Sequence, residues 1–268
     1  MQKGNMKIGI FDSGLGGLLI AKAIQKAMPE YDYVYLGDTK RVPYGNRSHE
    51  TVFEFTREAV DYLFRKENCA LVIIACNTAS ARALRRIQKE YLPETFPSRK
   101  VLGVLIPTAE ECVNFKNIGV LATVGTVASE TFPKEIKKVN SKAKIFQNPA
   151  PMLVPLAEEG EKVLAEKFLE KYLKPFQNKK LDALVLGCTH YPIFKNDIRK
   201  ILNKKIKVIS QDEIIPKKLK DYLVRHPEIE KNISKNSSTK ILATDKTKNM
   251  ELLTQKWFGK STKLNLVK

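Results

Sequence analysis

Residues Leu71–Thr78 read LVIIACNT, and residues Ala183–His190 read ALVLGCTH. In each stretch a short apolar run gives way to a cysteine and then to polar residues. A continuous apolar run of this length is typical of a strand buried on both faces of a parallel sheet. The two stretches therefore predict two buried strands, which are followed directly by Cys76 and Cys188.

The same organisation extends along the rest of the chain. Short apolar runs alternate with amphipathic stretches, which predicts an α/β fold with β-α-β units and a largely parallel sheet. The expected strands are Lys7–Phe11, Tyr33–Leu36, Leu71–Ala75, Val101–Leu105, Ile118–Leu121, Lys144–Phe146, Ala183–Leu186, Lys207–Ile209 and Lys240–Ala243. The expected helices are Leu18–Ala27, His49–Lys66, Ala79–Tyr91, Pro107–Phe115, Ser129–Lys138, Lys162–Tyr172 and Phe194–Leu202. The polar run KNISKNSS at residues 231–238 predicts an exposed loop.

Composition restricts the class of protein. The 268 residues are 43% hydrophobic and 28% charged, which is a globular composition with room for one large domain or two lobes. The longest apolar run, Cys69–Cys76, is far shorter than the roughly 20 residues that cross a bilayer, and the first nine residues lack the apolar core of a signal peptide. The four cysteines are too sparse for a disulfide scaffold and contain no C-x-x-C motif. We expect free thiols, no association with a membrane and a cytoplasmic location.

The chain is strongly basic, with a formal net charge of +18. Nucleic acid or an anionic surface is one interpretation of such a charge. However, the excess is mostly lysine, is spread along the chain, and lacks the interleaved aromatic residues that stack on bases. We therefore favour a solvated lysine-rich surface over a nucleic-acid partner.

A weak internal duplication relates the two halves. IGIFDSG (Ile8–Gly14) resembles IGVLATVG (Ile118–Gly125), and in the same alignment Cys76 falls opposite Cys188. The number of residues between the end of the first resembling strand and the cysteine is nearly the same in the two copies. The two cysteines are therefore expected to occupy equivalent places.

Ligands of open α/β sheets bind beyond the carboxyl ends of the strands, where Cys76 and Cys188 are expected. Asn77, Thr78 and Thr189 follow them and predict capped helix starts, which would lower the pKa of a neighbouring thiol. The alternative is that each cysteine is only a small buried hydrophobe. Two facing thiols suit one reaction: one removes a proton from carbon and the other supplies a proton to the opposite face, which inverts a stereocentre without a cofactor or metal.

Two further residues are placed to tune such thiols. Asp12 ends the first expected strand, and His190 lies two residues after Cys188. The alternatives are an ordinary turn aspartate and a core histidine. The glycine-rich stretch GLGG at residues 14–17 fits neither the G-x-G-x-x-G pattern nor the P-loop, so tight packing of the next helix explains it better than nucleotide binding.

Five segments resemble those of bacterial glutamate racemases, in the same order and at similar spacing: FDSGLGG, GDTKRVPYG, ACNTAS, VPLAEEG and GCTHYP. The resemblance covers the chain from about Lys7 to near its end. It implies two pseudo-symmetric α/β lobes with the active site between them. One lobe would comprise residues 1–99 and 211–268, and the other residues 100–210.

The resemblance also implies roles for individual residues. Cys76 and Cys188 would be the two catalytic acid/bases, with Cys188 acting on L-glutamate and Cys76 on D-glutamate. Asp12 would assist Cys76, while His190 and Glu158 would assist Cys188. The implied substrate contacts are Asp12, Ser13, Tyr44, Gly45, Asn77, Thr78, Thr189 and His190, with Thr123 and Thr126 as further candidates.

Three positions leave alternatives open. Glu158 adjoins Glu159, and from the residues alone both are interpreted as helix-start glutamates. Asp38 is a second candidate for assisting Cys76, or a strand-end turn residue.

Two segments depart from the family pattern. The family usually has serine, glycine and an acidic residue where this chain has Ser210-Gln211-Asp212, and a common threonine-glycine-aspartate is replaced by Ala243-Thr244-Asp245. Both departures are expected to lie away from the cysteines.

The implied activity is cofactor-independent interconversion of L- and D-glutamate, which would supply D-glutamate for peptidoglycan. The resemblance further implies a homodimer. The alternatives are an aspartate or hydantoin racemase of the same superfamily, or an additional nucleic-acid-binding role of the basic surface.

Overall fold

The computed structural model describes residues 4–202 and 205–267. Within these residues ten strands form two parallel sheets, with the orders β10-β9-β2-β1-β3-β4 and β6-β5-β7-β8. The strands of the first sheet are β1 (Lys7–Asp12), β2 (Tyr33–Gly37), β3 (Cys69–Ile74), β4 (Lys100–Gly103), β9 (Thr239–Ala243) and β10 (Leu264–Leu266). Those of the second are β5 (Asn117–Ala122), β6 (Lys144–Pro149), β7 (Ala183–Gly187) and β8 (Lys207–Ile209).

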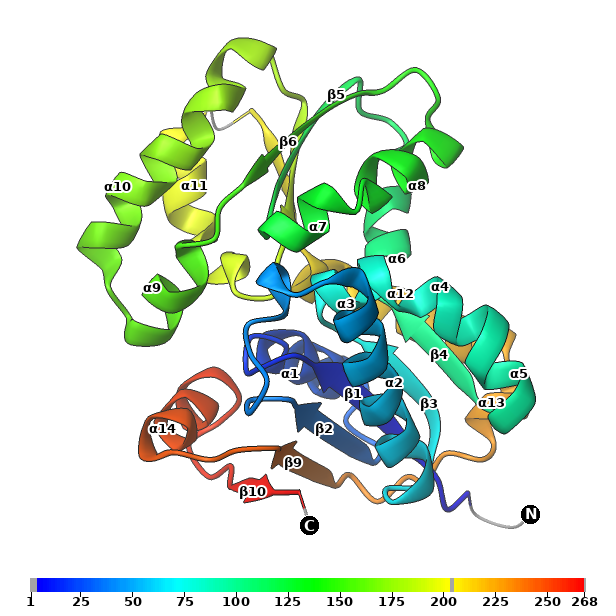
Figure 1. Cartoon of the computed structure of the whole chain (residues 1–268). Coiled ribbons are helices and arrows are strands. Elements are labelled where there is room, and N and C mark those ends of the chain that lie inside the picture. Colours follow the sequence, from blue (N-terminus) through cyan, green and yellow to red (C-terminus); the bar gives the residue numbers. More distant parts are fainter. Residues whose placement is uncertain (1–3, 203–204, 268) are drawn as a thin grey trace.

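Helices cover both sheets (Figure 1). In the N-terminal part they are α1 (Leu18–Ala27), α2 (His49–Arg65), α3 (Asn77–Arg82), α4 (Leu84–Arg86), α5 (Leu92–Thr95) and α6 (Leu105–Glu110). They continue with α7 (Val124–Ala128), α8 (Thr131–Val139), α9 (Leu153–Glu159), α10 (Lys162–Leu173) and α11 (Lys195–Ile201). The last are α12 (Gln211–Arg225), α13 (Pro227–Glu230) and α14 (Lys248–Trp257). Short 3₁₀ helices span Tyr44–Asn46, Lys174–Lys179 and Tyr191–Phe194, and a π-helix spans Ile87–Tyr91.

The molecule has two lobes, each built around one sheet (Figure 1). We call the lobe of the six-stranded sheet the first lobe and that of the four-stranded sheet the second lobe. The chain completes the second sheet at β8 and then returns to the first lobe, where β9 pairs with β2. The apolar runs that predicted β3 and β7 are buried along their whole length, because both strands are central in their sheets. Burial of these runs from water on both faces supplies the main stabilisation of each lobe.

The two sheets share a strand order. β2-β1-β3-β4 of the first sheet corresponds to β6-β5-β7-β8 of the second. β3 and β7 therefore occupy equivalent positions beside β1 and β5, in accord with the internal duplication. Cys76 lies two residues after β3, and Cys188 directly follows β7.

The α/β class and the parallel sheets are confirmed, and several boundaries differ from expectation. The expected division began the second lobe at Lys100, but Lys100–Gly103 forms β4, which pairs with β3 of the first sheet. Residues 1–3, 203–204 and 268, which the expected lobes include, lie outside the described residues. The single helix expected over Ala79–Tyr91 is divided into α3, α4 and the π-helix.

Apart from the short 3₁₀ helices, seven elements of the described residues have no counterpart among those expected: α5, α7, α9, α12, α13, α14 and β10. The sequence pattern of α12 is interrupted by Pro216, which lies inside the helix. β10 is only three residues long, with one of them buried. The polar stretch at residues 231–238 is a loop, as expected, although Ile233 and Ser234 within it are buried.

Candidate active site

Cys76 lies two residues after β3 and is 6% exposed. Its own side chain caps α3, since the sulfur accepts a hydrogen bond from the backbone N–H of Ala79 at 3.5 Å. The hydroxyl oxygen of Ser13 lies 3.2 Å from the same sulfur. The expectation that Asn77 and Thr78 cap this helix is therefore wrong, because both residues are already inside it.

The pKa of Cys76 is raised to about 12, which contradicts the expected lowering. Burial is the largest cause, because it disfavours the charged thiolate, and the carboxyl group of Asp12 acts in the same direction. The hydrogen bonds with Ser13 and Ala79 favour the thiolate but do not outweigh burial. Cys76 is therefore a protonated thiol near neutral pH.

Cys188 directly follows β7, is 5% exposed, and belongs to a chain of contacts with two other side chains. Its sulfur lies 3.8 Å from Nδ1 of His190. Nε2 of His190 lies 2.9 Å from Oε1 of Glu158. Glu158 is thus the glutamate that reaches the site, whereas Glu159 is exposed. The interpretation of both as helix-start residues is wrong, since they end α9.

His190 is held in its charged form. Burial acts to lower its pKa, but hydrogen bonds with Cys188 and Glu158 outweigh that effect and raise the pKa to about 10. The edge of its ring also meets Trp257 of α14, with ring centroids 5.6 Å apart. Sequence reasoning did not find Trp257, because it lies in an unexpected helix far along the chain.

The turn after β1 contacts both halves of the site. Asp12 is 1% exposed, and its Oδ2 accepts a hydrogen bond from the backbone N–H of Gly14 at 3.0 Å. The hydroxyl of Thr189 donates to Oδ1 at 3.5 Å, so this pair joins the first lobe to the second. Thr189 was expected to cap a helix but forms this contact instead. Burial raises the pKa of Asp12, opposed by the charge of His190 and by hydrogen bonds from backbone N–H groups.

Three threonine hydroxyls meet on the other side of the site. Oγ1 of Thr78, in α3, lies 2.9 Å from Oγ1 of Thr123 and 3.3 Å from Oγ1 of Thr126. Thr123 caps α7, so these contacts also join the two lobes. Gly45 packs against the Thr123 side chain, since a Cβ at this glycine would lie 3.2 Å from Cβ of Thr123. The structure thus brings both secondary threonine candidates to the site.

Asp38 is buried, and both oxygens of its carboxylate accept hydrogen bonds from neighbouring side chains. Its Oδ2 accepts hydrogen bonds from the Tyr44 hydroxyl at 2.5 Å and from Nε of Arg41 at 2.6 Å. Its Oδ1 accepts from Thr244 at 2.8 Å. These contacts fit the strand-end interpretation of Asp38, and they fix Tyr44 against the first lobe. Thr244, one of the two departures from the family pattern, serves this cluster.

The other departure from the family pattern, the segment that contains Gln211, lies beside the site. The carboxamides of Asn77 and Gln211 form two reciprocal hydrogen bonds, of 3.1 and 2.7 Å, and both side chains are buried. Asn77 adjoins Cys76 in the chain, so the expectation that the Gln211 segment lies away from the cysteines is wrong. The departure itself was the sequence signal, but the contact depends on the return of the chain from the second lobe.

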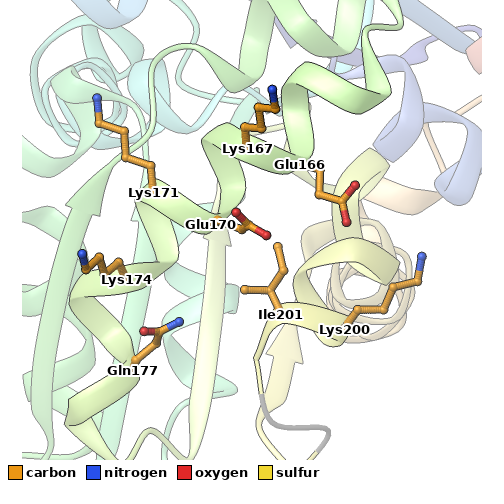
Figure 2. A pocket seen from close by; sticks show the side chains of 8 residues that line it. All are labelled: Glu166, Lys167, Glu170, Lys171, Lys174, Gln177, Lys200 and Ile201. Carbon is orange, nitrogen blue, oxygen red and sulfur yellow. The ribbon is translucent and has the colours of Figure 1, made fainter.

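A surface hollow lies elsewhere, between α10 and α11 on the second lobe (Figure 2). Charged side chains dominate its lining, and none of the candidate site residues contributes to it. Its lining residues are Glu166, Lys167, Glu170, Lys171, Lys174, Gln177, Lys200 and Ile201. The hollow therefore has neither the thiols nor the histidine that make the region between the lobes chemically distinctive.

Two expectations about the whole chain concern thiols and membranes. All four cysteines are free, as expected, and all four are buried. Among the described residues, no helix combines the length and the apolar character needed to cross a membrane.

Comparisons with known proteins identify the family of the chain. The sequence profile of the Asp/Glu/Hydantoin racemase family matches residues 19–214. The glutamate racemase of Aquifex aeolicus is 40% identical over 253 residues, which cover 92% of each chain. A glutamate racemase isoform of Bacillus anthracis superposes with a TM-score of 0.89 at 30% identity, covering 98% of both chains. The Francisella tularensis glutamate racemase, solved in complex with D-glutamate, gives a TM-score of 0.87 at 32% identity, covering 98% of this chain and 97% of that one. The chain therefore belongs to the glutamate racemases, within the Asp/Glu/hydantoin racemase family.

Proposed function

We propose that this racemase interconverts L- and D-glutamate by a two-base reaction in which Cys188 and Cys76 act on opposite faces of the α-carbon. The observation that carries the proposal is the pair of buried cysteines, which follow equivalent strands of the two sheets. The hydrogen bond from Thr189, next to Cys188, to Asp12 joins the two halves and supports a common site.

The unequal surroundings of the two sulfurs support a direction for the first step. The sulfur of Cys188 lies 3.8 Å from Nδ1 of His190, and the raised pKa of His190 places a cationic imidazole beside this thiol. Cys76 keeps its proton because burial and Asp12 raise its pKa. With L-glutamate, the Cys188 thiolate accepts the α-proton and the electron pair remains on the substrate. The Cys76 thiol then donates its proton to the opposite face.

The products of this step are D-glutamate, a Cys188 thiol and a Cys76 thiolate. The protonation states are then those needed for the reverse reaction, in which Cys76 acts on D-glutamate. Asp12 and Ser13 are the polar side chains on the Cys76 side. His190 and Glu158 form a hydrogen-bonded pair on the Cys188 side.

Hydroxyl, amide and imidazole donors lie near the two cysteines and suit a substrate with two carboxylates. We propose that these groups bind and orient glutamate so that the α-carbon lies between the thiols. Hydrogen bonds to the α-carboxylate also stabilise the negative charge that develops when the α-proton leaves. The proposed binding residues are Asp12, Ser13, Tyr44, Gly45, Asn77, Thr78, Thr189 and His190, with Thr123 and Thr126 beside them.

The decisive test replaces each thiol separately. Cys76→Ala and Cys188→Ala are each expected to reduce racemisation by at least about 10³-fold, because each removes an essential proton carrier. Racemisation is measured by polarimetry, and exchange of the α-proton is measured in D₂O from each enantiomer.

Cys69→Ala and Cys112→Ala are matched controls, because both cysteines are buried but follow neither of the two site strands. Their turnover is expected to stay near the wild-type value. Wild-type turnover in either Cys76→Ala or Cys188→Ala would rule out the two-base reaction.

Glutamate is favoured over the aspartate and hydantoin alternatives by the curated relatives, which carry the name glutamate racemase at 35–40% identity. We further propose that the product serves peptidoglycan synthesis, that the protein acts in the cytoplasm, and that it forms a homodimer. The family resemblance supports these three proposals, and the four free thiols also support a reducing compartment. The two sheets support a division into two lobes, with the first extended to Gly103.

A further inference from the structure

We infer that Gln211 is a positioning residue for the reaction, because it fixes the Asn77 carboxamide beside Cys76. Gln211 also connects Asn77 to the start of α12, where the chain returns from the second lobe to the first. The inference rests on the proposed function, in which Asn77 binds glutamate. Gln211 contacts Asn77 and acts through it.

The reciprocal pair restricts Asn77 strongly. Nδ2 of Asn77 donates to Oε1 of Gln211 at 3.1 Å, and Nε2 of Gln211 donates to Oδ1 of Asn77 at 2.7 Å. Two parallel hydrogen bonds hold the two amide planes together and use one N–H of each group. Asn77 therefore retains one N–H for a third partner, in a direction set by the pair.

Burial makes the pair more important than a surface contact. The exposed fractions of Asn77 and Gln211 are 2% and 0%. Water does not readily replace a partner at such a place, so an Asn77 amide without Gln211 would seek other partners. Gln211 thus keeps the Asn77 amide in place while the substrate is absent.

Gln211 is also the first residue of α12, which begins two residues after β8 of the second sheet. Nζ of Lys195, at the start of α11, lies 3.3 Å from Asp212 and 2.7 Å from Glu213 in the first turn of α12. The start of α12 is therefore tied to the second lobe by Lys195 and to the first lobe by Gln211. The placement of Asn77 depends in this way on the packing of both lobes.

The test replaces Gln211 with methionine, which has a similar size and cannot form the pair. Gln211→Met is expected to raise the KM for both glutamate enantiomers about five- to tenfold, with a smaller effect on kcat, because Asn77 loses its orientation for binding. Gln88→Met is the matched control, since Gln88 donates a hydrogen bond to the Val101 carbonyl outside the site. The control is expected to leave KM within about twofold of the wild type.

A double variant separates positioning from general destabilisation. In an Asn77→Ala background, Gln211→Met is expected to cause no further rise in KM, because the residue acts through Asn77. Gln211→Asn, with a side chain one carbon shorter, is expected to raise KM as Gln211→Met does and serves if the methionine variant does not fold. An unchanged KM in the Gln211 variants, or an equal rise in the Asn77→Ala background, would overturn the inference.

The outcomes also separate this inference from the proposed function. If Asn77→Ala itself leaves KM unchanged, the proposed substrate contact fails, and the inference fails with it. If Asn77→Ala raises KM and Gln211→Met does not, only the positioning role of Gln211 fails.

Discussion

His190 is the residue on which most of the site depends. Its ring contacts Cys188, which precedes it by two residues, Glu158 from α9 and Trp257 from α14. Cys188 and Glu158 form hydrogen bonds with the ring, and Trp257 packs against it as an aromatic neighbour. Because His190 is 6% exposed, its charge is balanced by these neighbours and only weakly by water.

The His190–Glu158 pair predicts a pH-dependent contribution to stability. The pKa of His190 is raised from 6.5 to about 10 in the folded protein. The stabilisation is therefore fully present below about pH 6.5, where both states carry the proton, and it is lost as the pH rises towards 10. Glu158→Gln is expected to lower the free energy of unfolding by about 1 kcal/mol at pH 6, and by less at pH 10.

Chemical denaturation at pH 6, 8 and 10 measures this difference. Glu159→Gln is the control, because Glu159 is exposed at the adjacent position. A gap between wild type and Glu158→Gln that stays constant from pH 6 to pH 10 would contradict the raised pKa.

Among the elements, the turn between β1 and α1 determines how closely the lobes approach. A Cβ at Gly16 would lie 2.5 Å from both Nδ1 of His190 and Oγ1 of Thr189. The second-lobe residues therefore pack directly against the backbone of the first lobe. The glycine-rich stretch GLGG serves this close approach as well as the packing of α1.

Gly16→Ala is accordingly expected to displace the His190 ring. The added methyl group forces His190 and Thr189 to move, which should lower kcat/KM at least about tenfold and the free energy of unfolding by about 1–3 kcal/mol. Gly14→Ala is the matched comparison in the same turn, because its Cβ would lie 3.2 Å from the Val42 side chain alone. Steady-state kinetics showing equal losses in the two variants would refute this role of Gly16.

At the scale of the whole molecule, polar contacts hold the two lobes together around the site. Asp12–Thr189 and Thr78–Thr123 cross between the lobes on two sides. Nε of Arg82, in α3, adds a hydrogen bond to the Gly125 carbonyl of the second lobe at 3.1 Å. A substrate that binds between the lobes adds contacts to both and should therefore stabilise the folded molecule as a unit.

Glutamate is expected to raise the melting temperature. A ligand at about 100 times its Kd adds about 2.7 kcal/mol, which corresponds to a shift of about 5–10 °C for a protein of this size. Differential scanning fluorimetry with D-glutamate, and with D-aspartate at the same concentration, measures the effect. A larger shift with aspartate would favour the aspartate racemase alternative over the proposed substrate.

The sequence predicted the parts of this structure that depend on local chemistry. The buried strands, the two cysteines after them and the segments shared with the glutamate racemases all lie in short continuous stretches. It did not predict the raised pKa of Cys76, because burial by distant elements outweighs the start of a helix. Trp257 and Gln211 were missed because their contacts with His190 and Asn77 join residues far apart in the chain.

The late pairing of β9 with β2 has a consequence for synthesis on the ribosome. β2 is buried along its whole length in the finished protein, but its partner on one side is Thr239–Ala243, about 200 residues later in the chain. All strands of the second lobe are translated before that partner emerges. During this interval a nascent chain exposes β2 as an unpaired apolar edge, which is the kind of surface that chaperones cover and that aggregates when left open.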